Sequence, residues 1–88
     1  MTEQDYMAEL ARKGYPAPTT KTWEAGRLNA DHTHDHALFL YILEGRMTIE
    51  MEGAAHDLRP GDICEVPGGL PHSEQAGAEG VRFLVAAR

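Results

Sequence analysis

The chain has 88 residues and a mass of 9.7 kDa, which is the size of one small domain. Its apolar fraction of 42% and charged fraction of 25% are ordinary for a folded globular protein, and they exclude a disordered tail or a coiled coil. Fourteen acidic residues against eight basic ones give a net charge of −6, so the surface repels phosphate backbones and we expect no nucleic-acid partner.

Residues 2–13 have the pattern of a short amphipathic helix. Thr2 is a suitable N-cap, acidic residues fall in the first turn, basic residues fall in the last, and Gly14 follows as a left-handed C-terminal residue. Two prolines within residues 15–18 end the helix, because proline cannot continue it. We therefore expect a helical lead-in over residues 1–18.

From residue 19 to residue 88 the apolar pattern has period two, which is typical of β-strands. Turns rich in glycine and proline divide this part into seven short predicted strands: 19–24, 37–43, 46–52, 54–58, 63–66, 72–76 and 81–86. The alternation predicts a buried face that includes Leu38, Leu40, Ile42, Met47, Ile49, Met51 and Phe83. Many short strands without helical crossovers predict an all-β antiparallel sandwich or barrel.

Histidine is the residue type that stands out, because His32, His34 and His36 are spaced two apart. On a regular strand these positions share one face, where two imidazoles can bind one ion. His72 follows a rigid turn at residues 67–71, which can direct another imidazole to the same place. Three neutral imidazoles suit Fe, Mn, Zn, Ni or Cu as divalent ions and leave coordination positions open. His36 is either a further ligand or a solvent-exposed loop residue.

Two stretches around these histidines resemble the paired motifs of the cupin superfamily. Residues 26–45 follow the first motif as Gly-x5-His-x-His and a later Gly, and residues 61–72 follow the second as Gly-x5-Pro-x-Gly-x2-His. Fifteen residues separate the two motifs, as in compact prokaryotic cupins. The resemblance implies a cupin double-stranded β-helix, which is an antiparallel jelly-roll barrel, over residues 19–88. It also implies a divalent metal held by His32, His34 and His72.

The chain departs from the cupin motifs at two positions. The glutamate ligand of the first motif is replaced by Leu38, and the asparagine of the second motif is replaced by Ala76. Three-histidine sites of this kind resemble those of thiol dioxygenases and some diketone-cleaving cupins. Without the carboxylate, a divalent ion keeps its full charge inside an apolar cup, where charge is costly. We therefore expect a small anionic metabolite as the partner, and we expect Leu38→Glu to tighten metal binding.

Three functions stay open on the sequence. The protein is a binding or sensing cupin, a metal-dependent dioxygenase or isomerase of a small molecule, or a structural cupin with a vestigial site. No catalytic base is evident, so no catalytic residue is assigned. We expect Cys64 to be a small buried side chain rather than a reactive thiol, and His56 to be structural or exposed.

Two further expectations concern assembly and location. A barrel this small leaves apolar surface in water, so we expect a homodimer formed through the edge strand 19–24 and the apolar stripe of the helix (Tyr6, Met7, Leu10 and Ala11). The acidic N-terminus lacks the features of a signal peptide, and no apolar run reaches the length of a membrane span. With a single cysteine, the chain is expected to be cytoplasmic and away from membranes.

Overall fold

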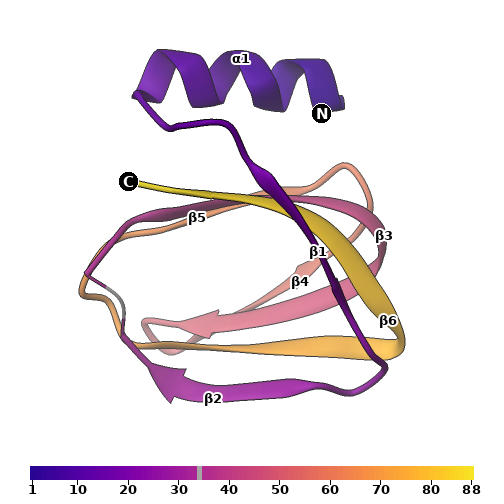
Figure 1. The fold of residues 1–88 in the computed structure, drawn as a ribbon. Helices are drawn as coiled ribbons and strands as arrows, with labels where there is room; N and C mark the ends of the chain where they lie inside the picture. The colour runs from indigo at the N-terminus through magenta and orange to yellow at the C-terminus, as the bar shows by residue number, and fades with distance from the viewer. Residues whose placement is uncertain (34) are drawn as a thin grey trace.

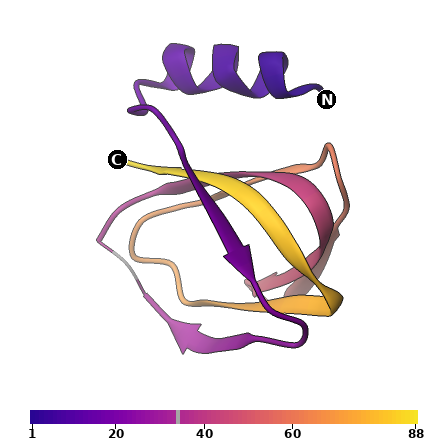
Figure 2. The same ribbon diagram turned by 45° about the vertical axis from the view of Figure 1, so that its right-hand side comes forward.

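The computed structural model describes residues 1–33 and 35–88, and for Asp31 and His32 it describes the backbone alone. Six strands curve around a common interior, and one helix lies across one side of them, next to the C-terminus (Figure 1 and Figure 2). The elements are α1 (Glu3–Lys13), β1 (Thr19–Trp23), β2 (Leu28–His32), β3 (Leu38–Met51), β4 (Ala54–Leu58), β5 (Ile63–Val66) and β6 (His72–Ala87).

Two long strands, β3 and β6, form the centre of the sheet and pair with each other from Leu38 opposite Ala87 to Met51 opposite His72. β2 and β1 pair with the first and second parts of β6, while β4 and β5 pair with β3. Every one of these pairings is antiparallel, which confirms the predicted all-β barrel with a short N-terminal helix.

The four strands predicted within residues 37–52 and 72–86 are in fact the two long strands β3 and β6. These strands bend instead of ending, because their mutual register shifts on both sides of Glu44 and Gly45. Gly45 has a φ of 78°, and a Cβ at this position would collide with the carbonyl oxygen of Gly80. Gly45 therefore marks an irregularity within a continuous strand rather than a turn between two strands.

Alternate residues of β3 face two separate apolar clusters. Leu40 and Ile42 point into the barrel, where they pack with residues from the other strands, including Trp23, Met47, Ile49, Val66 and Phe83. Phe39 and Tyr41 point outward and pack against Tyr6 and Leu10 of α1. Of the predicted core residues, Leu38 and Met51 are half-buried and the others are buried.

The helix begins as predicted. The Thr2 side chain accepts a hydrogen bond from the Asp5 backbone N–H at 3.1 Å, and Gly14 ends the helix with a φ of 80°. Because Tyr6 and Leu10 are buried against β3, the middle of the apolar stripe is already covered, and this corrects its predicted role as a dimer contact. In the described part of the chain, no helix is long and apolar enough to cross a membrane.

Candidate metal centre and ligand cavity

His72, the first residue of β6, has its imidazole inside the barrel and is 1% exposed. Its Nδ1 lies 3.0 Å from the backbone carbonyl oxygen of Leu70, in the turn rich in proline and glycine. Since a carbonyl can only accept, Nδ1 carries the hydrogen of this bond and donates it, which makes Nε2 the nitrogen that bears the lone pair in the neutral tautomer. Metal-binding histidines commonly have their tautomer fixed in this way.

Glu74 occupies the next inward position of β6 and was missed in the sequence analysis. It is 5% exposed, and its Oε1 lies 3.6 Å from His72 Nε2. Alternate residues of a strand share a face, so the parity of Glu74 with His72 was a usable signal.

The structure treats the other predicted histidines differently. β2 ends at His32, whose backbone lies opposite His72 in the antiparallel pair of β2 and β6. His34 lies outside the described residues. His36 is exposed in a bend beyond β2, which agrees with the alternative of a solvent-exposed loop residue. His56 is exposed on β4, as expected.

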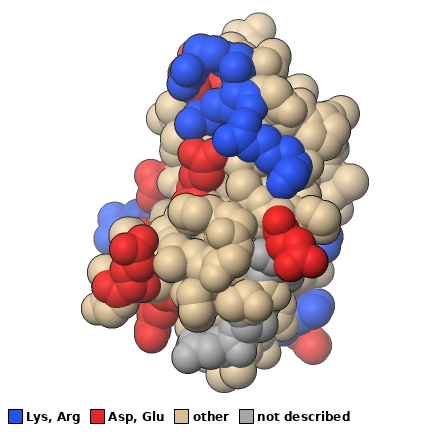
Figure 3. Space-filling view, turned by 90° about the vertical axis from the view of Figure 1, so that its left-hand side faces the viewer, with Lys and Arg blue, Asp and Glu red and all other residues tan. Residues whose placement is uncertain are grey.

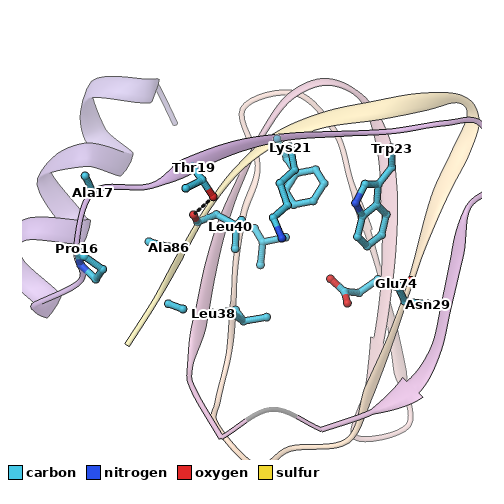
Figure 4. Close-up of a pocket in the computed structure, with 13 residues that line it drawn as sticks. Pro16, Ala17, Thr19, Lys21, Trp23, Asn29, Leu38, Leu40, Glu74 and Ala86 are labelled. Carbon is cyan, nitrogen blue, oxygen red and sulfur yellow. Dashed lines mark hydrogen bonds between the residues drawn. The ribbon is translucent and has the colours of Figure 1, made fainter.

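Beside this pair of side chains lies a cavity of about 380 Å³, a volume within the range of small-molecule sites. Its walls are mostly apolar and include Trp23, Leu38, Leu40, Phe83 and Val85. Two charged residues also line it, Lys21 from β1 and Glu74 from β6. In Figure 4 the Glu74 carboxylate points into the cavity, Lys21 reaches toward it from the opposite side, and Leu38 lies on another wall.

The geometry of His72 and Glu74 fits part of a metal site. Two donors that bind one transition ion at the usual lengths lie roughly 3.0–3.6 Å apart for angles between about 90° and 120°. The 3.6 Å separation of His72 Nε2 and Glu74 Oε1 falls at the upper end of this range. Among the described side chains, which do not include those of Asp31, His32 and His34, no group of three such donors is found. The further donors that the sequence indicates are His32 and His34.

Cys64 is buried on β5, as predicted. Burial, aided by the nearby charges of Glu74 and Glu65, raises the pKa of its thiol to about 11. A thiol is nucleophilic only as the thiolate, so at neutral pH this side chain is an inert part of the core.

One family of known proteins matches most of this chain. The cupin domain family matches the chain over residues 20–86, which is most of its length. The chain belongs to the cupin family. This membership supports the predicted barrel.

One curated protein is similar to part of this chain. The dimethylsulfoniopropionate lyase DddW of Ruegeria pomeroyi is 36% identical over 52 residues, which cover 59% of this chain and 34% of the lyase. The chain thus spans about a third of that curated relative.

Solved structures show the same fold. The DMSP lyase DddQ of Ruegeria pomeroyi has a TM-score of 0.69 at 23% identity, over 82% of this chain and 47% of that one. KdgF of Halomonas sp. has a TM-score of 0.67 at 22% identity, over 82% of this chain and 69% of that one. At such identities the likeness concerns the fold alone.

Proposed function

We propose that the protein binds a divalent transition metal through His32, His34 and His72, and that the ion and the adjacent cavity bind a small anionic metabolite. The observation that carries this proposal is the buried His72 ring, whose Nδ1 is tied to Leu70 so that Nε2 faces the interior. The His32 position lies directly opposite in the register of β2 and β6. Opposed positions of an antiparallel pair lie on the same face of the sheet, which supports a shared ion.

The cavity supports an anionic ligand of modest size. Its apolar walls exclude water from most of a small molecule, and the Lys21 ammonium offers one cation to an acidic group. A divalent ion, when bound, supplies a Lewis acid and a second positive charge. His72 holds its ring in one orientation through Leu70, so the site is organised before the ligand arrives.

Metal binding by histidine variants tests this proposal. Purified protein should be titrated with Co2+ at neutral pH, together with His32→Ala and His72→Ala. We expect each variant to bind Co2+ at least about tenfold more weakly, since loss of even an outer-shell partner costs that much. His36→Ala and His56→Ala are matched controls, because both side chains are exposed, and they should bind as the wild type does. Absence of Co2+ binding, or equal binding by all variants, would favour a structural cupin with a vestigial site.

Catalysis is the second candidate function, and the similarity to a dimethylsulfoniopropionate lyase favours it. Elimination from a sulfonium carboxylate needs a base that removes a carbon-bound proton. The described residues that line the cavity include two ionisable side chains, Lys21 and Glu74. Neither is assigned as the base, so a binding role is placed ahead of a catalytic one. Oxygenase and isomerase activities are further enzymatic alternatives. Release of dimethyl sulfide by the metal-loaded protein, and none by His72→Ala, would establish the lyase.

We also propose that the protein is a homodimer that pairs through β1. This strand is at one end of the path β1-β6-β3-β4, and all of its residues except Trp23 are exposed. Exposed edge strands need to be covered or paired. Light scattering should therefore give twice the chain mass of 9.7 kDa, and a monomer mass at tens of micromolar would disprove the dimer.

A further inference from the structure

We propose that Glu74 is itself a metal ligand and supplies the carboxylate that the first cupin motif places at the position of Leu38. This inference rests on the proposed metal site. It assigns to that site a fourth donor from a different strand, because Leu38 belongs to β3 and Glu74 to β6.

Position is the first argument. His72 and Glu74 are successive inward residues of one strand, and both side chains are almost fully buried. Glu74 and Leu38 both line the cavity, and the carboxylate points into it (Figure 4). A carboxylate on β6 can therefore reach the same space as one on β3.

The distance between the two side chains is the second argument. A charged hydrogen bond between an imidazolium and a carboxylate is about 2.7–2.9 Å long. His72 Nε2 and Glu74 Oε1 are 3.6 Å apart, which is longer than such a bond and matches two donors of one ion. The Nδ1 hydrogen bond to Leu70 leaves the ring in the tautomer that a metal requires.

Electrostatics is the third argument. Three neutral imidazoles leave a divalent ion without neutralising charge, which is costly in an apolar interior. The Glu74 carboxylate would supply one negative charge, and the site would keep one positive charge for an anionic ligand. The position of Leu38 is then free to be apolar, because the charge it would carry is supplied by β6.

Metal preference distinguishes this role from a structural one. Carboxylate oxygens suit Mn2+, whereas imidazole nitrogens suit Ni2+ and Cu2+. Loss of a carboxylate ligand should therefore weaken Mn2+ binding more than Ni2+ binding. Loose packing around an altered core residue would weaken both ions to a similar extent.

The test compares Glu74→Gln with the wild type in equilibrium titrations with Mn2+ and Ni2+. We expect Mn2+ binding to weaken by at least about tenfold and Ni2+ binding to weaken less. Glu50→Gln is the matched control, because Glu50 is an exposed residue of β3, and it should bind both ions as the wild type does. Equal Mn2+ binding by Glu74→Gln and the wild type would overturn only the role of Glu74 as a ligand and would leave the proposed histidine site standing. A wild type that binds neither ion would overturn the metal site itself.

A second variant restores the carboxylate from the other strand. The double variant with Leu38→Glu and Glu74→Gln should regain most of the lost Mn2+ affinity. In contrast to the expectation from the motif alone, the single Leu38→Glu variant should not tighten binding, since Glu74 already supplies the carboxylate. Thermal unfolding of each variant shows whether the barrel is intact. A double variant that folds and binds Mn2+ no better than Glu74→Gln, or a single Leu38→Glu variant that binds much more tightly than the wild type, would contradict the proposal.

Discussion

The Tyr6 hydroxyl donates a hydrogen bond of 2.7 Å to the backbone carbonyl oxygen of Phe39, and it joins α1 to the central strand of the barrel. The Tyr6 ring also lies 5.1 Å from the ring of Phe39 and 5.3 Å from that of Tyr41. An isolated helix of 11 residues is marginal in water. The helix is therefore held in place by this packing and by the hydrogen bond at its centre.

Substitutions of Tyr6 should separate the contributions of the hydrogen bond and of the ring packing to the free energy of unfolding. Tyr6→Phe removes the hydrogen bond and should lower the free energy of unfolding by about 1 kcal/mol. Tyr6→Ala also removes the buried ring and should lower it by about 3–5 kcal/mol. Met7→Ala is the control, because Met7 is 42% exposed on the same helix, and it should have little effect in urea unfolding. A small effect of Tyr6→Ala would show that the helix does not stabilise the barrel.

Glu65 ties the segment after the helix to β5. Its Oε2 accepts a hydrogen bond of 2.6 Å from the Tyr15 hydroxyl, and its Oε1 lies 3.0 Å from Lys13 Nζ. The hydrogen bond from Tyr15, together with Lys13 and Arg88, holds the pKa of Glu65 below its usual value. The view in Figure 3 shows basic side chains gathered near one end of the molecule, with acidic side chains below them.

A pH series on Tyr15→Phe tests this contact. A carboxyl whose pKa is lowered by folding contributes stability above its unfolded pKa and loses it as the pH falls through the folded value. Tyr15→Phe should therefore cost about 1 kcal/mol at pH 7 and progressively less below about pH 4, as Glu65 becomes protonated. Urea unfolding of both proteins at each pH gives the difference. A cost that stays constant from pH 7 to pH 3 would mean that the ionised carboxylate is not involved.

Gly45 and Gly26 form a matched pair for testing the bend in β3. Both have positive φ values, 78° and 71°, so alanine is strained at either position. At Gly26 a Cβ would meet nothing within 4 Å, and Gly26→Ala should cost only about 1–2 kcal/mol. At Gly45 the added Cβ would collide with Gly80, so Gly45→Ala should cost about 1–3 kcal/mol more. Equal losses in thermal unfolding would contradict the close approach of the two strands.

Sequence periodicity predicts much of this fold, because many of its elements are determined by residues close together in the chain. The capping of α1 by Thr2 and Gly14, and the alternation of Met47 with its neighbours, depend on residues close in the chain. The two long strands were not predictable in this way. Gly45 marks a bend only because Gly80 lies against it, and that contact joins residues far apart in the sequence.

The candidate site also combines features that follow from the local sequence with features that depend on the folded barrel. The motif spacing places His32 and His72 on paired strands, and the structure has their backbones in register. His36 is outside the motifs, and its exposed bend beyond β2 agrees with the loop alternative for this residue. Glu74 shares the parity of His72, but its nearness to Leu38 in the cavity arises only when the barrel closes.

The central claim, that His72 binds a metal inside the barrel, is tested most directly by anomalous X-ray diffraction from crystals soaked in Mn2+ or Co2+. We predict one strong anomalous peak inside the barrel, about 2.0–2.2 Å from His72 Nε2, with the His32 and His34 imidazoles and the Glu74 carboxylate as the other protein ligands. No peak inside the barrel, or peaks confined to the exposed His36 and His56, would contradict it.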